Sequence, residues 1–184
     1  GLRGQPTSFL YLDGSYFYME FEDQIGSGFV GGLSSVQNVG DARHQGVELS
    51  VEVDVTQLAA DMGRHEKDGN VGTITFFYNA MFLDAKFIGG PNTGMMPQYA
   101  PNFIQKGGVE YSWRDRLKAR FGGSFVANHF ANDTNTAQFA VPSYKVWDLT
   151  ADFNVRPGVF SIFGGIYNVF DEPYFARVRG DGID

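Results

Sequence analysis

Few residues of this chain have the type and spacing that catalytic chemistry needs. The three histidines, His44, His65 and His129, lie on separate segments and show no metal-ligand spacing. The chain has no cysteine, which excludes disulfides and thiolate metal sites. Glu20 and Glu22 could suggest the carboxylate pair of a glycosidase, but a solvated rim at a strand end explains them more simply. We therefore expect no catalytic residue, no metal site and no cofactor.

Arg177 and Arg179 are the strongest candidates for a binding site, because arginine offers bidentate hydrogen bonds to an anion. The alternative is that they pair with Asp181 or Asp184, or remain in solvent. Weaker candidates, which are polar residues in expected loops, are Gln37 and Asn135.

These candidates stand between segments of alternating polarity. The stretch "VELSVEVDV" (Val47–Val55) has an aliphatic residue at every odd position and an acidic residue or serine at every even position. This pattern predicts a strand with two opposed faces. Similar patterns predict about seven strands, at Ser8–Ile25, Asp41–Thr56, Val71–Phe87, Asn102–Trp113, Leu117–Phe130, Ser143–Val155 and Val159–Phe170.

The composition fits one β-rich domain. The chain has 184 residues, of which 43% are hydrophobic and 16% aromatic, and it carries 24 glycines. The hydrophobic fraction excludes a disordered tail, and the aromatic and glycine content favours strands and tight turns. The net charge of −7 argues against a nucleic-acid partner. The sequence contains no run of about 18 apolar residues, so it predicts no transmembrane helix.

Two architectures satisfy the alternation, namely a soluble sandwich and a membrane barrel. Tight turns at 114–115 and 157–158 alternate with longer polar links at 26–40, 88–99 and 131–141. One link, 57–70, is longer than this alternation requires. Aromatic residues stand near the expected strand ends, as in the girdles of membrane barrels. Long loops at one end, short turns at the other and aromatic strand ends favour the barrel.

Three stretches carry a more specific resemblance. "GDARHQGVELSVEVDV" (Gly40–Val55), "VPSYKVWDLTADFNV" (Val141–Val155) and "FGGIYNVFDEPYFARV" (Phe163–Val178) follow one another in the chain. They resemble the Gly-Val-Glu strand opening, the Pro-x-Tyr-x-x-Trp-Asp-Leu strand and the Asn-Leu-Phe-Asp-x-x-Tyr signature of TonB-dependent outer-membrane receptors. Val169 replaces the usual leucine of the third motif. "HFANDTNTAQF" and "YFARVRGDGID" also look like the ferric citrate-type branch.

The resemblance implies an all-β fold, an antiparallel up-and-down transmembrane β-barrel segment of about seven strands. Residues 1–184 would be the C-terminal part of a receptor barrel, with the plug domain and the last strand absent. The implied function is TonB-energised uptake of an iron chelate, with ferric citrate as the candidate, across the bacterial outer membrane, without enzymatic activity. The implied partners are the chelate, outer-membrane lipid and the TonB complex, which would act through the missing N-terminal part.

The resemblance also places Arg177 and Arg179 in the final extracellular loop, where the family contacts its substrate. It assigns the two faces of the second expected strand: Val47, Leu49, Val51, Val53 and Val55 to lipid, and Glu48, Ser50, Glu52 and Asp54 to a wet lumen. Two alternatives remain: a passive porin-like or structural barrel, and a soluble β-sandwich binding module.

Overall fold

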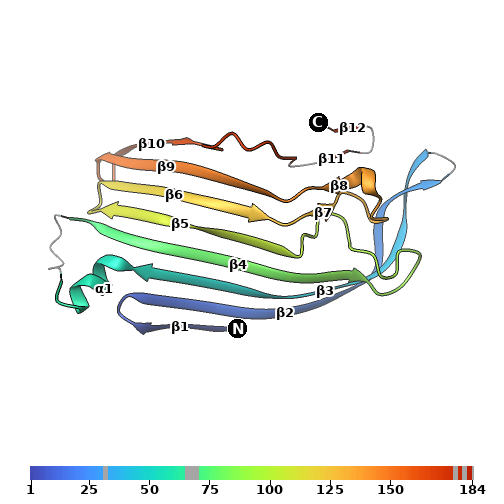
Figure 1. The fold of residues 1–184 in the computed structure, drawn as a ribbon, viewed down its shortest axis with the longest axis horizontal. Helices are drawn as coiled ribbons and strands as arrows, with labels where there is room; N and C mark the ends of the chain where they lie inside the picture. The colour runs from blue at the N-terminus through green and yellow to red at the C-terminus, as the bar shows by residue number, and fades with distance from the viewer. Residues whose placement is uncertain (31–32, 65–70, 176–177, 180–181, 184) are drawn as a thin grey trace.

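The computed structural model describes residues 1–30, 33–64, 71–175, 178–179 and 182–183. Within these residues, eight strands form one antiparallel sheet in the order β1-β2-β3-β4-β5-β6-β9-β10 (Figure 1). The strands are β1 (Leu2–Thr7), β2 (Leu10–Val30), β3 (Leu33–Asp54), β4 (Thr73–Phe87), β5 (Phe103–Trp113), β6 (Leu117–Val126), β9 (Tyr144–Arg156) and β10 (Phe160–Ile166). Two short pairs, β7 (His129–Phe130) with β8 (Ala140–Val141) and β11 (Val178–Arg179) with β12 (Gly182–Ile183), lie outside the main sheet. The predicted all-β, up-and-down antiparallel fold is confirmed, as a sheet that is not closed.

The connections divide the sheet into two ends. Short turns at 114–116 and 157–159 and the helix α1 (Val55–Asp61) lie at one end, here called the turn end (Figure 1). The long connections, 88–102 and 127–143, the second with a 3-10 turn η1 (Ala137–Phe139), lie at the other, the loop end. The long links predicted at 88–99 and 131–141 therefore lie at the end opposite the tight turns, as expected.

The expected boundaries of β2 and β3 were wrong. The link expected at 26–40 is mostly strand, because β2 and β3 pair as far as Val30 and Leu33 and form a long hairpin at the loop end. Val55, expected to face lipid in a strand, instead begins α1. Asp54 ends the alternation, since its side chain accepts the Gln57 N–H at 2.8 Å and caps the helix.

β1 was missed because its sequence, LRGQPT, contains glycine and proline and shows no alternation. All six of its residues are exposed, and it is an edge strand held by pairing with β2. No helix in the part of the chain described here is long and apolar enough to cross a membrane.

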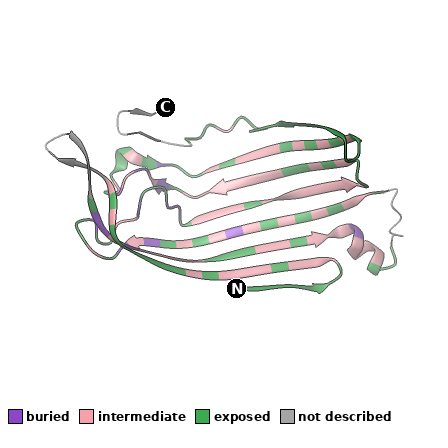
Figure 2. Ribbon diagram, turned by 180° about the vertical axis from the view of Figure 1, so that it is seen from behind, coloured by how far each residue is buried: buried purple, intermediate pink, exposed green. Residues whose placement is uncertain are grey.

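Cross-strand pairing gives the sheet two chemically distinct faces. Rows of paired residues on one face, here called the apolar face, are hydrophobic, as in Val51–Tyr78–Gly107–Gly123–Trp147. The adjacent row on the other face, the polar face, is Ser50–Asn79–Lys106–Ser124. The predicted separation of Val47, Leu49, Val51 and Val53 from Glu48, Ser50, Glu52 and Asp54 follows from this pairing. Few strand positions are buried (Figure 2), because neither face is covered.

The polarity of the faces reverses at the loop end of β3 and β4. On the continuation of the polar face, Ala42 and Phe87 are 0% and 1% exposed and pack with Val39 and Met95. On the continuation of the apolar face stand polar residues: Arg43, Gln45, Asp84 and Lys86. Asp84 accepts the amide of Gln45 at 2.8 Å and lies 3.4 Å from the Lys86 ammonium. The hydrophobic surface of the apolar face therefore ends between Val47 and Gln45.

Candidate functional site

At the loop end, hydrogen bonds hold the connections 88–102 and 127–143 together. Most of these bonds join a side chain of one connection to the backbone of the other. Asp133 accepts the Gln98 N–H at 2.9 Å. Asn135 binds both backbone groups of Met96, accepting its N–H and donating to its carbonyl, each at 2.8 Å. The Tyr99 N–H donates to the Phe130 carbonyl at 2.8 Å. Four hydrogen bonds thus join the two connections into one surface.

The β2–β3 hairpin adds a third wall to this arrangement. Asp133 is only 4% exposed, and a Cβ placed on Gly26 of β2 would stand 2.7 Å from its Oδ2. The same Cβ would stand 2.8 Å from Val39 of β3. Gly26 therefore permits the hairpin to approach Asp133 closely, and three connections meet around one buried carboxylate.

His44 lies on the hairpin beyond the polarity reversal, packed edge-on against Phe21 with 5.2 Å between ring centroids. Burial lowers the pKa of His44 below its ordinary value, because the imidazolium would lose solvation there. Its Nε2 is buried and has no hydrogen-bond partner among the described residues. The neutral ring therefore acts as an apolar packing group.

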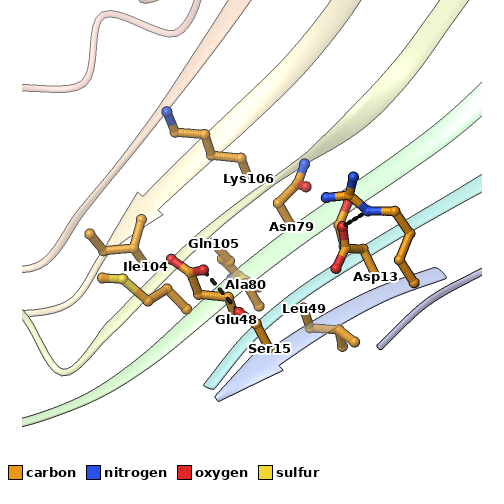
Figure 3. A pocket seen from close by; sticks show the side chains of 12 residues that line it. Asp13, Ser15, Glu48, Leu49, Asn79, Ala80, Ile104, Gln105 and Lys106 are labelled. Atoms are coloured by element: carbon orange, nitrogen blue, oxygen red, sulfur yellow. Dashed lines mark hydrogen bonds and ion pairs between the residues drawn. The ribbon is translucent and has the colours of Figure 1, made fainter. Parts of the chain in front are cut away.

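The polar face of the sheet is hollowed nearer the N-terminus. A depression of about 400 Å³ crosses β2 to β5 (Figure 3). Arg3 and Asp13 form an ion pair at 2.6 Å, and Ser15 donates to Glu48 at 3.1 Å. Figure 3 shows Asn79 and Lys106 on the neighbouring strands of the same depression. This is a hydrated, mixed-charge surface and contains no arrangement suited to bond chemistry.

Further along the polar face, one aromatic ring covers two glycines. Phe77 of β4 lies over Gly108 and Gly122, where a Cβ would stand 2.9 and 3.0 Å from its Cζ. The guanidinium of Arg120 lies 3.8 Å from the Phe77 ring centroid, a cation–π contact. The ring replaces the side-chain contacts that two paired glycines cannot make.

The second and third sequence motifs contact each other directly. Asn168 adopts a left-handed φ of 51°, and its N–H donates to Asp148 at 2.8 Å. The Asn168 amide also binds both backbone groups of Glu172, at 2.9 and 3.0 Å. Tyr144 stacks on Tyr174 with 4.9 Å between centroids. This turn is why β10 ends at Ile166 rather than at the predicted Phe170.

The predicted binding residues are only partly placed. Arg177 lies outside the described residues, and Arg179 is described only as backbone, paired with Gly182. Gln37 is likewise described only as backbone, paired with Gly26 in the hairpin. Asn135 lies at the loop end as expected, with its amide already bonded to Met96. All four remain predictions as ligand contacts.

The histidines are not brought together as a metal site. His129 is 7% exposed and lies 6.0 Å from the Tyr99 ring, whereas His44 packs against Phe21. His65 falls outside the described residues. No group of three potential ligands is present in the ranges that the structure describes.

Sequence reasoning missed Asp133, Phe77 and Arg120. Asp133 could not be distinguished from any other loop carboxylate without the fold. The Gly-Gly pairs at 107–108 and 122–123 were the available signal for Phe77, because paired glycines in adjacent strands require cover from neighbouring rings.

Comparisons with known proteins agree with this geometry. Residues 1–169 match the family described as "TonB dependent receptor-like, beta-barrel". Among solved structures, the chain is similar to the ferric yersiniabactin uptake receptor FyuA from Yersinia pestis, with 19% identity and a TM-score of 0.67 over 98% of this chain and 26% of that one. The ferric citrate transporter FecA shares 19% identity and a TM-score of 0.71, over 94% of this chain and 26% of that one.

The copper transporter OprC shares 18% identity with a TM-score of 0.66, over 94% of this chain and 24% of that one. At these identities the structural likeness establishes the fold alone. The chain spans about a quarter of the length of the structures it matches. A comparison with curated protein sequences gave no match.

The family match covers residues 1–169, nearly the whole chain, and the similar structures agree with the observed fold. Members of this family are receptors of the bacterial outer membrane, so the expected localisation and the expectation of a non-enzymatic protein are confirmed. The chain belongs to the TonB-dependent receptor β-barrel family.

Proposed function

We propose that this chain belongs to a receptor that imports an iron chelate, with ferric citrate as the first candidate, in a process energised by TonB. The observation that carries the proposal is the match of residues 1–169 to the receptor barrel family. Two of the similar structures are named for ferric ligands, ferric yersiniabactin and ferric citrate. The resemblance of residues 129–139 and 174–184 to the ferric citrate-type branch adds the candidate ligand.

In this proposal the apolar face meets lipid and the polar face lines a hydrated lumen. The loop end faces outward and the turn end faces the periplasm. The polarity reversal between Val47 and Gln45 supports this orientation, because polar side chains then leave the lipid on the side of the long connections. The helix α1 lies on the periplasmic side.

The ligand contacts proposed here are Arg177 and Arg179, whose guanidinium groups suit the carboxylates of an anionic chelate. Supporting this, β11 and β12 lie at the loop end of the sheet (Figure 1). Asp133 and Asn135 act by position: they fix connections 88–102 and 127–143 relative to each other. Gln37 is a weaker contact proposed from the hairpin.

Uptake in a deletion strain tests the proposal. A strain without the whole receptor is supplied with single iron sources, and uptake of radiolabelled iron is measured with and without TonB. We expect the deletion strain to lose uptake of ferric citrate, and the complemented strain to lose it again when TonB is removed. Uptake that survives loss of TonB would indicate a passive barrel, and wild-type growth on ferric citrate would remove this ligand.

The proposed contacts need a separate test. Replacing both Arg177 and Arg179 with alanine should weaken chelate binding by at least tenfold, since each charged hydrogen bond contributes about 1.5–3 kcal/mol. The matched control is Arg156→Ala, an exposed arginine at the turn end of β9. Unchanged affinity of the double variant in calorimetry would exclude these two residues.

A further inference from the structure

The apolar face of the sheet contains a groove that has no role in the function proposed above. The groove has a volume of about 650 Å³ and crosses the strands from β3 to β9. Its walls are hydrophobic and include Val51, Phe76, Val109 and Phe121. These strands lie inside the sheet, away from its edges at β1 and β10, so each has its hydrogen-bonded neighbours on both sides. The groove is therefore a feature of the intact sheet and not of an exposed edge.

Two glycines form the floor of the groove. Gly107 of β5 pairs with Gly123 of β6, and both lie on the apolar face. A Cβ on Gly123 would stand 2.7 Å from the Trp147 ring, and one on Gly107 would stand 3.1 Å from the Tyr78 ring. The two rings cover the glycines, so aromatic surface lines the groove there. A flexible chain can lie there in contact with aromatic surface.

The groove is polar at one end only. Lys145, near the loop end of β9, lines it beside Gln105, whose side chain accepts the Tyr78 hydroxyl at 2.7 Å. Lys145 is exposed and has no ion-pair partner among the described residues. By contrast, Arg43 and Lys86 on the same side of the sheet lie 3.7 and 3.4 Å from Asp84. The charge of Lys145 is therefore available to a ligand.

We propose that this groove binds one membrane lipid, with an acyl chain against the Tyr78 and Trp147 rings that cover Gly107 and Gly123 and a phosphate headgroup on Lys145. The polarity of the groove matches such a molecule: a long apolar section ends at a single cation on the outward side. A flat barrel wall gives a lipid no preferred position, whereas the groove above the two glycines defines one binding position. The inference rests on the membrane orientation proposed above and not on which ligand is imported.

Native mass spectrometry of the detergent-purified whole receptor tests this site. The probe is phosphatidic acid, titrated against diacylglycerol with the same two acyl chains. We expect one phosphatidic acid to bind more tightly than diacylglycerol. Lys145→Gln should weaken phosphatidic acid binding about fivefold, which corresponds to about 1 kcal/mol for one lysine near a lipid headgroup. The control Lys106→Gln, on the polar face, should leave binding unchanged.

A second variant tests the groove itself. Val109→Phe keeps an apolar side chain on the lipid side and fills part of the groove. We expect it to weaken binding of both lipids, with Lys145 intact. If Lys145→Gln binds phosphatidic acid like the wild type, or if Val109→Phe has no effect, the proposal is overturned. Because these measurements need neither chelate nor TonB, their outcome is independent of the uptake tests.

Discussion

Substitution of Val51 by arginine tests which face of the sheet meets lipid. Val51 lies on the apolar face of β3, opposite Leu12 and Tyr78, midway between the polarity reversal near Val47 and the end of the strand at Asp54. An arginine at the bilayer midplane costs a transmembrane barrel about 2–4 kcal/mol, and one near an interface about 0–1 kcal/mol. We therefore expect Val51→Arg to lower the free energy of unfolding by about 2–4 kcal/mol.

Two matched variants separate lipid contact from other effects. Glu52→Arg places the same side chain one residue later, on the polar face opposite Phe77, and it should cost less than about 1 kcal/mol as a surface charge change. Val47→Arg stays on the apolar face but lies next to the polarity reversal, so its cost should also be near the interfacial value. The face of the sheet and the depth in the membrane thus predict that only one of the three arginine substitutions, Val51→Arg, strongly destabilises the barrel.

The measurement is urea unfolding of the whole receptor in lipid bilayers, followed by the shift of the folded band in unheated gel samples. The expected loss for Val51→Arg is a factor of about 30 to 700 in the folding equilibrium. Equal stability of Val51→Arg and Glu52→Arg would refute the assignment of faces. A larger loss for Val47→Arg than for Val51→Arg would refute the position of the membrane.

Three further substitutions probe the site and its supports. Phe77→Ala uncovers two glycines and removes a cation–π contact, so it should destabilise the barrel by about 2 kcal/mol in urea unfolding; an unchanged midpoint would contradict this role. Asp133→Ala should speed amide exchange of residues 96–99 without affecting the central strands, whereas Gln138→Ala, an exposed control, should leave exchange unchanged. Because the pKa of His44 is lowered in the folded state, its contribution to stability is present above its ordinary pKa and is lost as pH falls through that value towards the folded pKa. Protection factors of the β3 amides next to His44, which correct for the intrinsic pH dependence of exchange, should therefore fall between pH 7.5 and 5.5 in the wild type and not in His44→Phe. Equal pH dependence in both would refute the sign.

The alternation of side chains was enough to predict most of the sheet. Within β4 to β9 each long strand was predicted within a few residues, because period-two polarity is a local property of the sequence. β1 could not be predicted, since an exposed edge strand depends on pairing with β2 and carries no pattern of its own. The start of α1 depends on one side chain, Asp54, which reads equally well as the last polar residue of a strand.

The candidate site was less predictable, because it depends on contacts between connections. Asp133 is recognisable only when Gln98 and Gly26 are brought beside it. The polarity reversal on β3 also makes a prediction from local alternation fail. Ala42 and Phe87 are buried, although they lie on the face of the sheet that is polar nearer the turn end. A residue's environment there depends on its position along the barrel axis, and sequence alternation does not report that position.

The residues that carry the family resemblance have a structural reason to be where they are. Asn168 forms the turn after β10 through a left-handed backbone and three hydrogen bonds, one of them to Asp148 of the preceding motif. An alanine would keep the backbone N–H that donates to Asp148 but lacks the two side-chain bonds to Glu172, and an aspartate cannot donate to the Glu172 carbonyl. Such motifs therefore identify the barrel family and carry no information about its ligand. In the function proposed above, ligand choice depends on the connections at the loop end, where Asp133 and Asn135 fix two of them as one surface.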